Sequence, residues 1–264
     1  MHYGMPTLLE LNGLEENAKL CAELRLDFIE LNMNLPEYQP HVIDVGYFSE
    51  IAQKYGVYYT IHLDENLDAC DFNDKVAMAY TQTVLEIIDI AKELNVHMLT
   101  MHMLKSVHFT LPNKRVFLYE KYLDMYIIKL IAFRDACETA IGDADITIGL
   151  ENGWHLQEAK FRARTFDLLL ESPVFGLTFD VGHSAGCAAD VVVVMENLDK
   201  LRHMHIHDAK DRKNHLLLGE GEQDLQKYFV LANTHNCRAV IEVKTVDGLR
   251  RSVDWLDENW RANA

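Results

Sequence analysis

The 264-residue sequence has little proline and comparatively little basic charge: it contains 5 Pro, and 25 Lys and Arg stand against 41 Asp and Glu. Its formal net charge at pH 7 is therefore −16. A surface of this sign repels nucleic acid at long range, so nucleic acid is not expected as a partner. The 13 glycines are also thinly spread, and hydrophobic residues make up 49% of the chain. This composition excludes collagen-like, low-complexity and disordered classes.

Long apolar runs are missing as well. No stretch approaches the roughly 18 consecutive apolar residues that a membrane-spanning helix requires. Residues 1–6 lack the basic and apolar regions of a signal peptide, so we expect a cytoplasmic protein without membrane association. The cysteines form no Cys-x-x-Cys pair and are expected to be reduced and mostly buried. They are Cys21, Cys70, Cys137, Cys187 and Cys237.

Short β-prone runs alternate with stretches of helical spacing along the chain. Strands are expected at residues 7–11, 27–32, 57–62, 96–102, 146–151, 175–180, 201–208 and 238–243, and helices at 74–94, 115–141, 225–236 and 248–260. The strand runs are rich in Val, Ile and Leu, as parallel strands covered on both faces are. We therefore predict the α/β class and a (β/α)8 TIM barrel, forming a single domain over residues 1–264. A doubly wound open sheet is the alternative, but no Gly-x-Gly-x-x-Gly follows the first strand.

Most of the predicted strands carry or end in side chains of the metal-ligand type. These side chains are His62, His102, Glu151, Asp180, His205 with His207, and Glu242, and His183 follows shortly after Asp180. Because the carboxyl ends of barrel strands meet at one mouth, the side chains should converge. Imidazole and carboxylate groups without thiolates suit a divalent cation, and clustered carboxylates would repel one another without it. The sequence therefore predicts a metal site at the barrel mouth.

Other polar features have weaker interpretations. The remaining histidines are expected in exposed loops or helix flanks: His2, His41, His97, His108, His155, His203 and His235. Trp154 is expected either to line a substrate pocket or to pack in the interior. The locally basic segment at residues 210–215 is either a solvated loop or an anion-binding site.

Three short motifs accompany the strand-end residues: Asp-x-Gly-His at 180–183, His-x-x-Asp at 205–208 and Leu-Gly-Glu-Gly at 218–221. Together they resemble the xylose isomerase-like TIM barrel superfamily. That superfamily contains sugar and sugar-phosphate isomerases and epimerases, and also the endonuclease IV enzymes. The resemblance runs from about residue 57 to the C-terminus.

The epimerase branch implies one divalent metal ion held by Glu151, Asp180, His205 and Glu242. Zn²⁺ or Mn²⁺ is the first expectation, and Mg²⁺ or Co²⁺ is also compatible. The implied function is an isomerase or epimerase of a sugar or sugar phosphate, in which Glu151 and Glu242 transfer a proton through a metal-stabilised enediolate. His207 and Lys213 are candidate substrate-binding residues. Association into a homo-oligomer is left open.

The endonuclease IV branch implies instead a zinc-dependent phosphodiesterase acting on abasic-site DNA with three metal ions. Its ligands have counterparts in Glu151, Asp180, His205 and Glu242 and in the additional metal or substrate-binding candidates His62, His102, His183 and His215. One further ligand position, an Asp in that branch, is Lys213 here, and its ammonium would repel a third cation. Lys213 and the net charge therefore favour the epimerase. A non-catalytic ligand-binding barrel is a third alternative, which the complete ring of ligand-type residues opposes.

Overall fold

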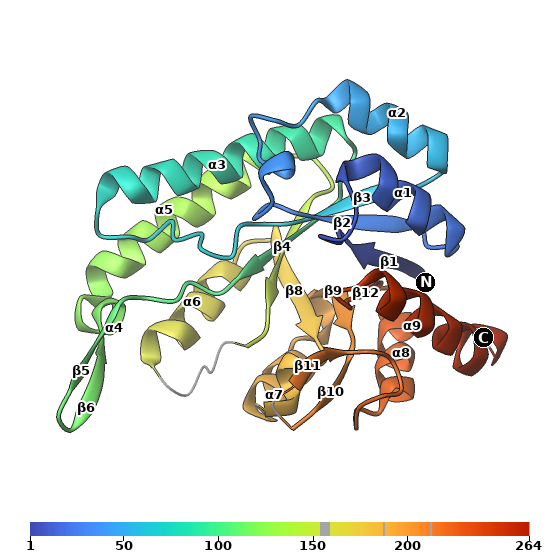
Figure 1. Cartoon of the computed structure of the whole chain (residues 1–264). Coiled ribbons are helices and arrows are strands. Elements are labelled where there is room, and N and C mark those ends of the chain that lie inside the picture. Colours follow the sequence, from blue (N-terminus) through green and yellow to red (C-terminus); the bar gives the residue numbers. More distant parts are fainter. Residues whose placement is uncertain (154–158, 187, 212, 264) are drawn as a thin grey trace.

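A computed structural model of the chain describes residues 1–153, 159–186, 188–211 and 213–263. Parallel strands in the order β1-β12-β9-β8-β7-β4-β3-β2 form a closed barrel, and helices surround it (Figure 1). The predicted (β/α)8 TIM barrel is therefore confirmed. The first strand and the last helix lie side by side, so the two ends of the chain are close together (Figure 1).

The barrel strands are β1 (His2–Pro6), β2 (Phe28–Asn32), β3 (Tyr58–His62), β4 (Met98–His102), β7 (Thr147–Glu151), β8 (Phe175–Asp180), β9 (Leu201–Ile206) and β12 (Arg238–Ile241). The α-helices are α1 (Gly13–Glu23), α2 (Val45–Tyr55), α3 (Asp74–Glu93), α4 (Leu118–Lys121), α5 (Leu123–Ile141), α6 (Lys160–Leu170), α7 (Ala188–Glu196), α8 (Leu225–Thr234) and α9 (Val246–Asn259). Short 3₁₀ helices are η1 (Pro36–Tyr38), η3 (His183–Gly186), η4 (Leu198–Lys200) and η5 (Arg261–Asn263). Two antiparallel hairpins lie outside the barrel: β5 (His108–Leu111) with β6 (Lys114–Phe117), and β10 (Asp208–Lys210) with β11 (Lys213–Leu216).

The helix ends have local chemical causes. Asn73 accepts the N–H of Lys75 at 3.1 Å at the start of α3, and Thr245 accepts the N–H of Gly248 at 3.1 Å at the start of α9. Such N-caps satisfy backbone donors that have no partner within the helix. The helices predicted at 74–94, 225–236 and 248–260 are accordingly confirmed to within two residues at each end.

The prediction of the first strand at residues 7–11 was wrong, because β1 is His2–Pro6. Gly and Pro are depleted in strands, so Gly4 and Pro6 concealed this one in the sequence. The barrel nevertheless requires Gly4: a Cβ atom there would lie 2.3 Å from the ring of Phe28.

The predicted start of the helix at 115–141 was also wrong. Residues 114–117 form β6, and α5 begins only at Leu123. Leu111 pairs with Lys114 across a two-residue turn at 112–113. The Pro-Asn dipeptide at this turn is a typical turn signal, which outweighs the helical spacing of the apolar residues that follow.

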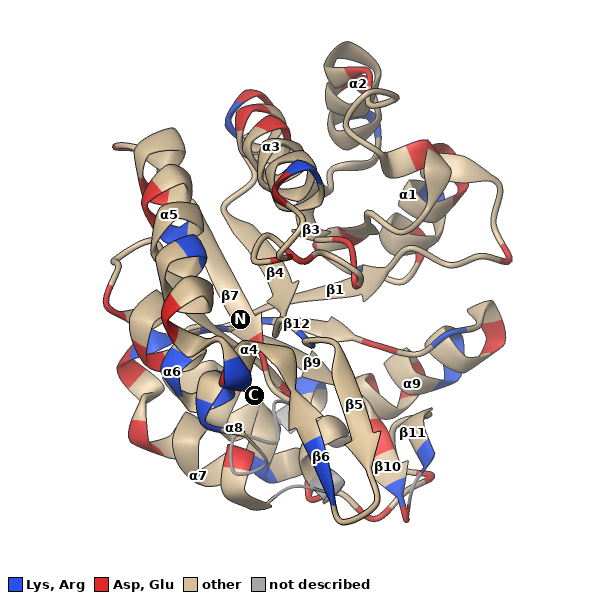
Figure 2. Cartoon of the chain, turned by 90° about the vertical axis from the view of Figure 1, so that its left-hand side faces the viewer, with Lys and Arg blue, Asp and Glu red and all other residues tan. Residues whose placement is uncertain are grey.

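The core and the surface agree with the composition. Cys21, Cys70, Cys137 and Cys237 are buried and free, as predicted, and Cys187 lies outside the described residues. Within the described ranges, no helix is long and apolar enough to cross a membrane. Acidic and basic residues both lie on the outer helices, and β6 carries basic residues (Figure 2).

Asp208 fixes the segment that follows β9. Its carboxylate is 1% exposed and accepts the backbone N–H groups of Ala209 at 2.9 Å, Gly219 at 3.0 Å and Gln223 at 3.0 Å. The side chain therefore closes the loop that contains β10 and β11 and returns His215 to the barrel mouth.

Asp208→Asn should lower the free energy of unfolding by about 1–3 kcal/mol, because the amide turns a donor toward at least one buried backbone N–H. Urea denaturation would measure the loss, and amide hydrogen exchange should accelerate at residues 209–224. Asp211→Asn is the matched control, because Asp211 is exposed in the same loop. An equal loss of stability in both variants would show that the buried hydrogen bonds are not responsible.

Candidate metal centre and active site

Three carboxylates and one imidazole meet at the C-terminal mouth of the barrel. Glu151 ends β7, Asp180 ends β8, His205 lies near the end of β9, and Glu242 follows β12. These strands are consecutive neighbours in the barrel. One ligand atom from each of the four side chains lies within 4.8 Å of the other three. The structure thus brings the four predicted ligands together.

The distances around His205 fit a divalent cation. Its Nδ1 lies 3.2 Å from Glu242 Oε2, 3.5 Å from Glu151 Oε1 and 3.8 Å from Asp180 Oδ2. A tetrahedral zinc ion with bonds of about 2.1 Å separates its ligand atoms by about 3.4 Å. Within the described part of the chain, both ring nitrogens of His205 and Glu242 Oε2 are buried and make no well-directed hydrogen bond. Because buried polar atoms are normally satisfied, His205 Nδ1 and Glu242 Oε2, which face one another, point to a cation between them.

Three further predicted histidines surround Glu151. Its Oε2 lies 3.1 Å from His62 Nε2 and 3.0 Å from His102 Nε2, and its Oε1 lies 3.2 Å from His183 Nδ1. Each oxygen of Glu151 therefore has a different set of neighbours. Oε1 faces the candidate metal position, and Oε2 faces the imidazoles of β3 and β4.

His207 and His215 lie on the other side of the cluster. The buried ring of His207 places Nε2 3.1 Å from Asp180 Oδ1 and accepts the backbone N–H of His215 at Nδ1, at 2.9 Å. His215 Nδ1 lies 3.9 Å from Glu242 Oε1. A Cβ atom at Gly182 would lie 1.8 Å from the His207 ring, so the glycine of the Asp-x-Gly-His motif leaves room for that ring.

Lys244, which the sequence did not mark as a site residue, contacts the cluster. Its Nζ lies 2.6 Å from Glu242 Oε1. Lys213 is exposed on β11 and pairs in register with Lys210. The only sequence signal for Lys244 was its position two residues after the strand-end Glu242.

Glu30, in the middle of β2, was also missed. Its carboxylate is 3% exposed, accepts a hydrogen bond from His203 Nε2 at 3.0 Å, and lies 2.8 Å from His205 Nε2. The prediction that His203 is exposed was therefore wrong. Alternate residues of a strand face the same side, so His203 lies on the interior face with His205. An acidic residue within the apolar run Phe28–Asn32 was the available signal for Glu30.

The charges of the cluster shift the pKa values of its members. Burial alone would lower the pKa of His62 and His183, but their contacts with Glu151 outweigh burial and raise each pKa to about 9. The pKa of His205 is raised as well, because the surrounding carboxylates outweigh burial. Burial favours a higher pKa for Glu151 and Glu242, but His205 holds the pKa of both well below the usual range.

A cavity of about 360 Å³ adjoins the cluster at the barrel mouth. Its walls come from the ends of β1, β2, β3 and β12. Among the described residues, they include Thr7, Leu8, Asn32, Asn34, His62, Glu65, Glu242 and Lys244, whereas Lys213 is not part of them. Trp154, the predicted pocket residue, and His155 lie outside the described residues.

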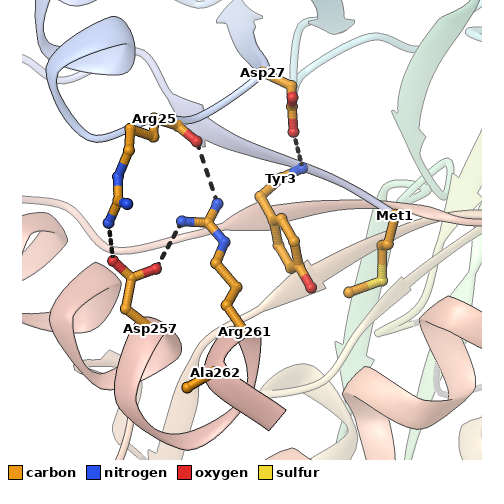
Figure 3. A pocket seen from close by; sticks show the side chains of 7 residues that line it. All are labelled: Met1, Tyr3, Arg25, Asp27, Asp257, Arg261 and Ala262. Carbon is orange, nitrogen blue, oxygen red and sulfur yellow. Dashed lines mark hydrogen bonds and ion pairs between the residues drawn. The ribbon is translucent and has the colours of Figure 1, made fainter. Parts of the chain in front are cut away.

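A larger cavity of about 560 Å³ lies at the opposite end of the barrel (Figure 3). Its charged groups bind one another: Arg25 and Arg261 both pair with Asp257, and the guanidinium of Arg261 lies 4.5 Å from the ring centre of Tyr3. None of the clustered ligands is among the described residues that line it. Active sites of TIM barrels lie at the C-terminal face, so the smaller cavity is the candidate active site.

The fold and the position of this cluster define a TIM-barrel protein with a metal-type site at the ends of its strands. A sequence profile described as "Xylose isomerase-like TIM barrel" matches residues 18–259. The chain therefore belongs to the xylose isomerase-like TIM barrel family. No curated protein matches its sequence significantly.

Several solved structures share the fold over nearly the whole chain. A D-tagatose 3-epimerase-like protein is 21% identical with a TM-score of 0.79, and the alignment covers 99% of this chain and 98% of that one. The 3-keto-D-glucoside 4-epimerase of E. coli is 14% identical with a TM-score of 0.73, covering 98% and 99%. A D-allulose 3-epimerase from Methylomonas sp., in complex with D-allulose, is 15% identical with a TM-score of 0.69, covering 98% and 97%. At these identities the likeness establishes the fold.

The metal-free protein should lose stability as the pH rises from about 6.5 to 9. The pKa of about 9 for His62 and His183 in the folded state lies above the value of about 6.5 for unfolded histidine. Their contribution to stability is therefore complete below pH 6.5 and is lost as the pH rises through the folded pKa.

Calorimetric melting temperatures in EDTA between pH 6 and 9.5 would measure this loss. The double variant His62→Gln with His183→Gln is the control and should show a flatter pH dependence. The same slope in wild type and double variant would contradict the assignment to these histidines.

Proposed function

We propose that this protein is a divalent-metal-dependent isomerase or epimerase of a sugar or sugar phosphate. The main observation that supports this proposal is the position of the buried His205 Nδ1: an oxygen of Glu151, Asp180 and Glu242 each lies within 3.8 Å of it. Glu151, Asp180, His205 and Glu242 would hold the metal ion. Imidazole and carboxylate ligands suit Zn²⁺ or Mn²⁺, and Mg²⁺ or Co²⁺ also accept them in part. When bound, such an ion polarises carbonyl and hydroxyl oxygens as a Lewis acid.

The two glutamates would transfer the proton. Each has one oxygen toward His205 and a second oxygen with other neighbours: Glu242 Oε1 beside Lys244, and Glu151 Oε2 beside His62 and His102. In the proposed reaction one of these second oxygens removes a proton from the carbon next to the substrate carbonyl. The other glutamate, which must carry a proton in this state, donates it from the opposite side, so the reaction leaves the first glutamate protonated and the second ionised. Positioned acid–base groups of this kind typically contribute about 10²–10⁴-fold.

The adjoining cavity suits a small polyhydroxylated substrate. Its volume of about 360 Å³ falls within the range of about 300–1,000 Å³ of small-molecule sites. Asn32, Asn34 and Thr7 offer hydrogen-bonding groups for hydroxyls, and Lys244 offers a cation for a phosphate. Substrate binding by His207 and Lys213 stays a prediction. The structural neighbours that are named as sugar epimerases support the choice of a sugar.

A zinc-dependent phosphodiesterase acting on abasic-site DNA is the second candidate. It is favoured by the close approach of His62 and His102 to Glu151 Oε2, which offers ligand atoms for a second ion. Lys244 opposes it, because an ammonium 2.6 Å from Glu242 Oε1 repels a further cation between Glu242 and His215. The net charge of −16 opposes binding to DNA.

Glu242→Gln should slow the reaction by at least about 10²–10⁴-fold, because the amide keeps the side-chain volume but cannot accept the proton. Deuterium incorporation from D₂O into D-tagatose, D-allulose and a ketose phosphate, followed by NMR with Mn²⁺ or Zn²⁺, measures it directly. Glu37→Gln, an exposed glutamate of η1, is the control and should exchange at the wild-type rate. Wild-type exchange in Glu242→Gln would reject its role as a base. A wild-type protein that exchanges no proton in any ketose would reject the epimerase.

The wild-type chain should retain one divalent ion after dialysis, and Asp180→Ala should retain none, because it lacks a ligand at the centre of the cluster. Elemental analysis gives the stoichiometry. EDTA should lower the melting temperature of the wild type and leave that of Asp180→Ala nearly unchanged, since a bound ion stabilises only the folded state that binds it. Equal responses would show that Asp180 is not a ligand. Three zinc ions per chain would favour the phosphodiesterase, and incision of abasic-site DNA would then be assayed.

A further inference from the structure

Glu30 has no part in the proposed proton transfer, yet its buried carboxylate lies against the ligand His205. We propose that Glu30 is a positioning residue: it holds His205 with the proton on Nε2 and thereby presents the Nδ1 lone pair to the metal ion. The distance from Glu30 Oε1 to His205 Nε2 is 2.8 Å, an ion-pair contact in which the ring N–H is not well aligned with the oxygen. On the other side of the ring, Nδ1 faces the three carboxylates of the cluster. The inference rests on the proposed metal-dependent function.

The carboxylate of Glu30 is held from several strands. Its Oε2 lies 3.2 Å from Thr60 Oγ1 on β3, 3.5 Å from Thr100 Oγ1 on β4 and 3.0 Å from His203 Nε2 on β9. These three donors use one oxygen and leave Oε1 directed at His205. The barrel backbone therefore fixes the direction of the contact.

The acceptor character of a carboxylate determines the tautomer of the imidazole. A neutral imidazole has one N–H donor and one acceptor nitrogen, whereas an ionised carboxylate only accepts. Carboxylates face both nitrogens of His205. When a cation occupies the position among the three carboxylates at Nδ1, the remaining proton belongs on Nε2 beside Glu30, and Nδ1 binds the cation. Metal-binding histidines usually donate their second N–H to a carboxylate or carbonyl in this way.

A purely structural role explains Glu30 less well. Burying a carboxylate among uncharged groups costs stability, and ion pairs in protein interiors are often no better than apolar packing. The threonines at positions 60 and 100 would need no acidic partner to remain in a barrel interior. The contact with His205 connects the buried charge to the site instead.

Glu30→Gln distinguishes the positioning role from a purely structural one. It preserves the side-chain volume but replaces one hydrogen-bond acceptor, an oxygen, by a donor, an NH₂ group. If the oxygen of the new amide accepts from His203, Thr60 and Thr100, its NH₂ group faces His205 Nε2. The proton of His205 then moves to Nδ1, where the metal ion should bind. Loss of such a supporting partner typically weakens metal binding by about 10–100-fold.

The experiment measures the dissociation constants of Zn²⁺ and Mn²⁺ by competition with a chromogenic chelator, together with the melting temperature in EDTA. We expect Glu30→Gln to bind both ions about 10–100-fold more weakly, with a metal-free melting temperature no lower than that of wild type. Asp27→Asn is the matched control: it removes a carboxylate that accepts the N–H of Tyr3 at 2.8 Å, at the opposite end of the barrel. Its metal affinity should equal that of wild type.

Unchanged affinity in a folded Glu30→Gln protein that is only less stable would overturn the inference and leave the proposed function intact. A wild-type protein that binds neither ion would overturn the proposed function as well. A second measurement does not depend on the variant: with ¹⁵N-labelled histidine in the zinc-loaded wild type, His205 should show its proton on Nε2 and in slow exchange. A proton on Nδ1, or zinc on Nε2, would exclude the positioning role.

Discussion

The burial of several carboxylates around one imidazole is the constraint on which the rest of this site depends. Glu30, Glu151, Asp180 and Glu242 have all lost most of their contact with water, and each faces His205. Without compensation, their mutual repulsion and lost hydration would oppose folding. Protons on the histidines supply part of the compensating charge, which is why several of their pKa values are raised. A divalent ion would supply the same charge at the same place, so protons and metal are alternatives there.

The closed barrel makes this concentration of charge possible. In the sheet, Asp180 pairs in register with His205, and His205 pairs with Val240, two residues before Glu242. Below this level, Glu30 lies among groups from β3, β4 and β9. The hydrogen-bonded strands, more than flexible loops, therefore set the separations between these candidate ligands. A lower polar layer, formed by Glu30 and its partners inside the barrel, therefore supports an upper polar layer, the cluster at the barrel mouth.

The sequence allowed the upper layer to be predicted, but not the lower one. Strand-end residues such as Glu151 and Asp180 follow continuous apolar runs, and parallel strands bring their carboxyl ends together whatever the loops do. Glu30 lies inside a strand, where sequence alone does not say which face points into a barrel. His203 was misplaced for the same reason. Lys244 was missed because its contact with Glu242 depends on tertiary packing, which the sequence does not reveal. The first strand was not predicted correctly, because the close approach of Phe28 requires a glycine at position 4, and glycine is a poor strand former.

The second oxygens of the two glutamates bear on the choice between the two candidate chemistries. At Glu242 that oxygen is next to the ammonium of Lys244, which repels any further cation and, together with His205, keeps the carboxylate ionised, as a proton acceptor must be. At Glu151 it is next to His62 and His102, whose neutral rings could accept a cation and whose protonated rings could not. With a pKa of about 9, His62 is protonated at neutral pH in the metal-free protein. An ion at either place must displace a proton, because the pKa of His205 is raised as well, but an ion at His205 also relieves the repulsion of three carboxylates. In the proposed function, His205 is therefore the first position that an ion would occupy.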